Sequence, residues 1–102
     1  MDHWAVVIEM LQGQDSPAAQ GLIDLAEHVR ALPAFEGVQA GLAGLALALG
    51  RAQSQRRVYV EWVRPWTYAV FLDFCEPAFY GQRVEVAIED VVTTIEQYLE
   101  QL

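Results

Sequence analysis

The sequence contains no lysine, no asparagine, one cysteine and two histidines. Without lysine, the chain can form neither a Schiff base nor the lysine contact of a phosphate-binding P-loop. A single cysteine, Cys75, excludes an intramolecular disulfide, and the N-terminus lacks the basic segment of a signal peptide. We therefore expect a protein of a reducing compartment, the cytoplasm.

Residues suited to metal binding or catalysis are correspondingly few. Asp24 and His28 stand four residues apart, but two ligands do not make a metal site, and we interpret them as an ion pair on a helix surface. Cys75 at a strand end is typical of a small buried hydrophobe. Glu61, between apolar strand residues, is better explained by an arginine partner than by acid catalysis. We expect no catalytic residue, no cofactor and no metal.

Basic residues are also scarce, with six against fourteen acidic ones and a formal net charge of −8. Affinity for nucleic acid comes mainly from clustered lysine and arginine, and anionic membranes attract the same side chains. The longest uncharged stretch, residues 37–50, is far shorter than the roughly 20 apolar residues of a membrane helix. Neither nucleic acid nor a membrane is an expected partner.

Apolar residues, by contrast, make up 54% of the 102 residues. This is enough for a hydrophobic core without disulfides or metals, and the length is that of one domain. No linker, repeat or low-complexity segment divides the chain. The sequence therefore predicts a single compact domain over residues 1–102.

Two segments have the pattern of amphipathic helices. In the first, Ser16 is a suitable N-cap, Pro17 suits the first helical position, and Pro33 ends the helix. In the second, residues 90–102, Asp90 is the expected cap and apolar residues recur at helical spacing. We expect both helices on one face of a sheet.

Three segments predict strands: 56–63 and 67–74, joined by a turn at Arg64-Pro65, and then 83–89. Residues 3–11 fit a strand or a helix, and we favour the strand. Residues 35–50 are also ambiguous, and we favour a strand over 42–49. The predicted fold is an α+β antiparallel meander of four to five strands, in the order β-α-β-β-β-β-α.

The hairpin over residues 58–74 is the most informative part of the sequence, because both of its faces are apolar. If Val63 pairs with Trp66, then Trp62 faces Thr67 and Tyr68 lies on the same face as Tyr59. Two helices can cover only one face of the sheet, so the second face must contact something else. The alternative is that residues 35–50 form a helix that covers it. The interaction surface that we predict consists of Tyr59, Glu61, Val63, Arg64, Trp66 and Tyr68.

The leading functional hypothesis is a small acidic, non-catalytic protein-interaction module of the adaptor, inhibitor, immunity or chaperone type, which forms a homodimer through this hairpin or binds another protein. A first alternative is a small-molecule-binding or enzymatic domain with a pocket between helix and sheet, near Cys75, Glu61 and Tyr80. A second is an acidic mimic of nucleic acid, which would use Glu85, Glu89, Asp90, Glu96 and Glu100.

Overall fold

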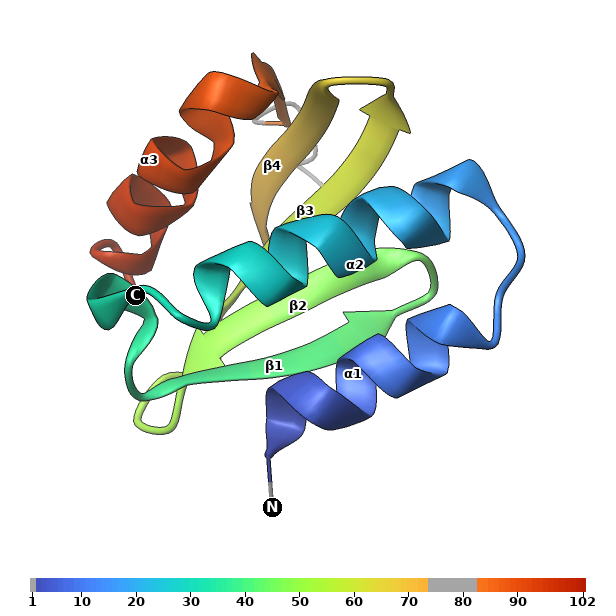
Figure 1. The fold of residues 1–102 in the computed structure, drawn as a ribbon. Helices are drawn as coiled ribbons and strands as arrows, with labels where there is room; N and C mark the ends of the chain where they lie inside the picture. The colour runs from blue at the N-terminus through green and yellow to red at the C-terminus, as the bar shows by residue number, and fades with distance from the viewer. Residues whose placement is uncertain (1, 74–82) are drawn as a thin grey trace.

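The computed structural model describes residues 2–73 and 83–102, and these residues form three α-helices and five strands (Figure 1). The elements follow in the order α1 (His3–Gln12), α2 (Pro17–Val29), a 3₁₀ turn (Pro33–Phe35), β1 (Val38–Ala43), β2 (Ala46–Arg51), β3 (Arg57–Arg64), β4 (Thr67–Asp73), β5 (Val84–Ala87) and α3 (Ile88–Leu99). The predicted α+β class is confirmed.

The five strands form one antiparallel sheet in the order β1-β2-β3-β4-β5, which is the predicted meander. All three helices pack on the same face of this sheet, with α1 and α2 over β1 to β3 and α3 beside β4 (Figure 1). The core lies between the helices and this face. Its largest fully buried side chains come from both layers: Leu11, Leu22, Val29, Leu47, Leu49, Val58, Val60, Val70, Val91 and Ile95.

The first element is a helix, so the strand predicted over residues 3–11 is wrong. The Asp2 carboxylate accepts hydrogen bonds from the backbone N–H groups of Trp4 and Ala5 and thereby caps α1. Burial then follows the helical period: Trp4, Val7, Ile8 and Leu11 are buried, whereas Val6 and Met10 are exposed. The observed order is therefore α-α-β-β-β-β-β-α. The helical cap outweighed the strand preference of the valines.

Residues 35–50 form strands and not a helix, as predicted, but their boundaries differ from 42–49. Ala43 pairs with Ala46, so Gly44 and Leu45 form a two-residue turn within the expected strand. Gly44 has a φ of +61°, which favours glycine at the first position of such a turn. Since β1 and β2 belong to the sheet, this segment does not cover the second face.

The two predicted helices are present with shifted ends. Ser16 caps α2 through a hydrogen bond from Ala19 N–H, but the helix ends at Val29, before Pro33. Asp90 is not the cap of α3, because β5 continues directly into the helix at Ile88. The Ile88 N–H donates to the Trp66 carbonyl instead (2.9 Å), so the β3–β4 turn takes the place of a side-chain cap.

Candidate functional site

The register of the β3–β4 hairpin determines which side chains share a face. Trp62 pairs with Tyr68 and Arg64 with Thr67, with a bulge at Val63 between the two pairs. Pro65 and Trp66 form the turn. The register expected from the sequence, with Val63 opposite Trp66, is wrong by one residue. A shift of one residue moves every side chain of a strand to the opposite face.

Tyr68 therefore lies on the helix-covered face and cannot belong to the predicted interaction surface. Its side chain is only 3% exposed, and its hydroxyl donates a hydrogen bond to the Gly21 carbonyl of α2 (2.7 Å). Burial raises the pKa of the Tyr68 phenol, and the negative charge of Asp24 raises it further. The hydrogen bond of Tyr68 thus joins β4 to α2.

Gly21 lies at the contact between α2 and the neighbouring aromatic pair. A Cβ atom on Gly21 would overlap the indole ring of Trp62, with its Nε1 at 2.7 Å. Trp62 and Tyr68 are paired across β3 and β4, and both lie against this point of the helix. A glycine in a helix interior costs about 1 kcal/mol relative to alanine, and here it makes room for the indole.

We expect Gly21→Ala to lower the free energy of unfolding by up to about 2 kcal/mol, because overpacking of about 1–3 kcal/mol opposes a gain of about 1 kcal/mol in helix propensity. Urea denaturation measures this change. In a Trp62→Ala background the same substitution meets no indole, so there it should be neutral or stabilising. A stabilising Gly21→Ala in the wild-type background would contradict the observed packing.

The opposite side of the sheet, the open face, is covered by none of the described helices. From the strand registers, it carries Gln39, Gly41, Ala43, Ala46, Ala48 and Gly50 on β1 and β2, Arg57, Tyr59 and Glu61 on β3, Thr67, Ala69 and Phe71 on β4, and Glu85 and Ala87 on β5. The rings of Tyr59 and Phe71 stack with their centroids 5.4 Å apart.

Charged side chains on the open face are joined by ion pairs. Arg83 contacts Glu61 (3.2 Å) and Glu85 (3.3 Å), and Arg64 contacts Glu85 (3.2 Å). Glu61 thus has the expected arginine partner, although that partner, Arg83, directly precedes β5 and does not come from its own hairpin. Such partly exposed pairs contribute about 0–1 kcal/mol each, so they orient the side chains more than they stabilise the fold.

Trp66 lies at the tip of the hairpin and is 74% exposed, the largest exposure among the large hydrophobic residues that the structure describes. Its φ is +63°, a left-handed conformation that is unusual for a bulky residue. Val63, at the bulge, is half-buried, and Arg64 is exposed. The predicted interaction surface therefore loses Tyr68, while its other five residues lie on the open face or near the tip.

The predicted acidic surface is divided by the fold. Glu85 lies on the open face in contact with two arginines, whereas Glu89, Asp90 and Glu96 lie on α3 and Glu100 is its C-cap, and this helix packs on the other face. Glu89 and Asp90 are in the first turn of α3, where negative charge is favoured by the helix dipole. The structure does not bring the five acids together on one surface.

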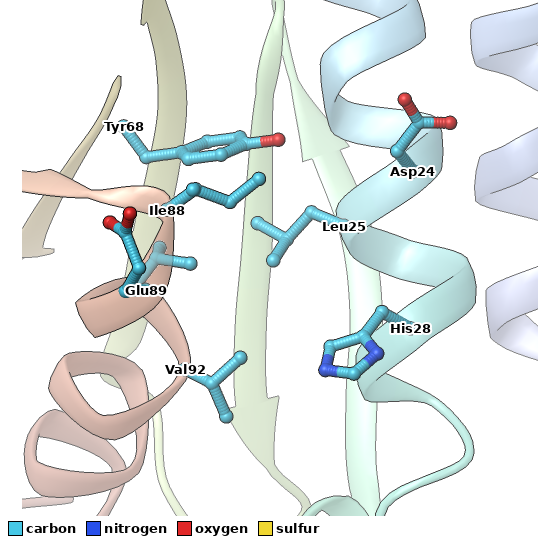
Figure 2. A pocket seen from close by; sticks show the side chains of 8 residues that line it. Asp24, Leu25, His28, Tyr68, Ile88, Glu89 and Val92 are labelled. Atoms are coloured by element: carbon cyan, nitrogen blue, oxygen red, sulfur yellow. The ribbon is translucent and has the colours of Figure 1, made fainter. Parts of the chain in front are cut away.

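A cleft of about 440 Å³ lies between α2 and α3, above the sheet (Figure 2). It is lined by Asp24, Leu25 and His28 of α2, Tyr68 of β4, and Ile88, Glu89, Val91 and Val92 of α3. The first alternative function places a pocket between helix and sheet near Cys75, Glu61 and Tyr80, and the lining of this cleft differs from that prediction. Glu61 lies on the open face, and Cys75 and Tyr80 lie outside the described residues.

The cleft was missed because its walls are far apart in the sequence. Asp24 and His28 are recognisable as one helix face, but nothing in the sequence places α3 beside that face. Within residues 2–73 and 83–102 no group of three or more potential metal ligands is found, and no helix is long and apolar enough to cross a membrane. No protein-family model, curated protein or solved structure matches the chain.

Proposed function

We propose that this chain is a non-catalytic protein-interaction module that forms a homodimer through the open face and the tip of the β3–β4 hairpin. The observation that carries the proposal is Trp66, an exposed tryptophan in a left-handed backbone conformation. Tryptophan is among the residues that contribute most to binding at protein interfaces.

The position of Trp66 is unfavourable for the isolated chain. A non-glycine residue in the left-handed region costs on the order of 1–2 kcal/mol, and glycine or asparagine normally occupies this position of a turn. Exposure of the ring to water adds no compensating stability. Local strain of this kind is typical of functional positions, so the ring is best explained by a contact that it makes with a partner.

The distribution of charge supports a second copy as that partner. Among the described residues on and beside the open face, Arg57, Arg64 and Arg83 accompany Glu61 and Glu85, so this side carries no excess of negative charge although the whole chain carries −8. Two copies can therefore meet here with less repulsion than through their helical surfaces. A face with both signs of charge is also suited to a two-fold contact, in which each patch meets its own copy.

Light scattering coupled to size exclusion tests self-association directly. We expect a species of twice the 11.4 kDa chain mass, with a larger dimer fraction at higher protein concentration. Because apolar burial and not charge drives the contact, the dimer should persist in about 1 M salt, where the Debye length is only about 3 Å. A monomer at every concentration would contradict the proposal.

A further inference from the structure

The cleft between α2 and α3 lies on the helix-covered side of the sheet, so what it does is independent of the open face. Its floor is apolar, with the Tyr68 ring and the side chains of Leu25 and Val91, all of which are buried. Its volume of about 440 Å³ lies within the range of about 300–1,000 Å³ that is typical of small-molecule sites.

The rim of the cleft is acidic on both sides. Asp24 projects from α2 and Glu89 from α3, with the apolar side chains between them (Figure 2). No arginine lines the cleft among the described residues. The two exposed carboxylates therefore lie at opposite sides of the cleft rim, without a neutralising cation from this part of the chain.

The polar side chains at the rim form few hydrogen bonds or ion pairs with the described residues. Asp24 accepts one hydrogen bond, from the Gln20 side-chain amide (2.9 Å). Neither the Glu89 nor the His28 side chain forms a hydrogen bond or an ion pair with the described residues. The hydrogen-bonding capacity that remains here consists of carboxylate oxygens and an imidazole, next to buried apolar surface.

We propose that this cleft binds a small organic cation with an apolar body, such as an aralkyl amine. The apolar part would lie against Tyr68 and Leu25, and the ammonium group would remain at the exposed rim, where the negative charges of Asp24 and Glu89 attract it. An anionic ligand would meet two carboxylates, and a purely polar cation would leave the apolar floor in contact with water. Only the amphiphilic cation satisfies both surfaces.

The test uses 4-phenylbutylamine as the probe, with 4-phenylbutan-1-ol and 4-phenylbutyrate as a neutral and an anionic match of the same shape. Titrations of the ¹⁵N-labelled full chain should show saturable amine binding with a Kd on the order of 1 mM, as expected for about eleven non-hydrogen atoms. The shifts should map to α2 and the start of α3. The alcohol should bind at least about fivefold more weakly, and the carboxylate more weakly still.

Charge-removing variants locate the ammonium group. Asp24→Asn and Glu89→Gln should each weaken amine binding about two- to fivefold and leave alcohol binding unchanged. Glu27→Gln is the matched control: it removes the same charge from an exposed position of α2 outside the cleft. The proposal would be overturned if the amine showed no saturable binding, or if amine and alcohol bound equally. It would also be overturned if all three variants had equal effects or if the shifts mapped to the open face.

Discussion

Tyr68→Ala is expected to lower the free energy of unfolding by about 3–5 kcal/mol, the range for loss of a buried aromatic ring. The ring is buried between the sheet and the helices, and its hydroxyl holds the Gly21 carbonyl of α2. Domains of this size have a total stability of about 5–15 kcal/mol, so the variant should unfold far below the wild-type urea midpoint. Chemical denaturation followed by circular dichroism measures the loss.

Tyr68→Phe separates the ring from the hydroxyl. It keeps the packing and removes one hydrogen bond to a carbonyl, so we expect a loss of only about 1 kcal/mol. If Tyr68→Ala instead left stability unchanged and abolished dimer formation, Tyr68 would belong to an interface and the observed register would be wrong.

The raised pKa of the Tyr68 hydroxyl predicts that the stability of the fold depends on pH. Because the folded state raises the pKa of Tyr68, the neutral phenol stabilises the native protein, and this contribution is fully present below the unfolded pKa of about 10. As the pH rises through the higher folded value, that contribution is lost. Stability of the wild type should therefore fall above about pH 10 more steeply than that of Tyr68→Phe. Identical pH profiles of stability for the wild type and Tyr68→Phe would contradict the raised pKa of Tyr68.

Much of the fold can be predicted from the sequence because local and long-range preferences agree there. The cap and proline at Ser16 and Pro17 begin a helix, and alternating aromatic and β-branched residues form the central hairpin. At residues 3–11 the local and the long-range preferences disagree. The alternation of apolar residues favours a strand, but the decisive group is the Asp2 carboxylate, whose capping of Trp4 N–H depends on the local backbone geometry.

The candidate site is less predictable because it depends on single-residue geometry. The bulge at Val63 changes the register of β4 by one residue and moves Tyr68 from the open face to the core. No local pattern distinguishes the two registers, since both faces of this hairpin are apolar. The interior glycine of α2 is a signal that could identify a close aromatic contact, but it does not say which ring makes that contact.

Trp66→Gly is expected to weaken dimer formation roughly 10³-fold and, at the same time, to stabilise the monomer. Each two-fold contact would lose two tryptophan rings, and a tryptophan that anchors an interface contributes about 2 kcal/mol or more. Glycine adopts the +63° φ without strain, so the free energy of unfolding should rise by about 0.5–1 kcal/mol after its greater freedom in the unfolded chain is subtracted. Sedimentation equilibrium and urea denaturation measure the two effects.

Two further variants distinguish the ring from the backbone. Trp66→Ala removes the ring but keeps a Cβ atom in the left-handed conformation, so it should weaken the dimer as much as glycine does without the gain in stability. Met10→Ala is the matched control, since Met10 is also an exposed apolar residue but lies on α1, away from the open face. A dimer that survives both Trp66 substitutions, or that Met10→Ala weakens equally, would contradict a role for the hairpin tip. If Trp66→Gly weakens association and raises the free energy of unfolding, the strained tryptophan is retained for the contact that it makes.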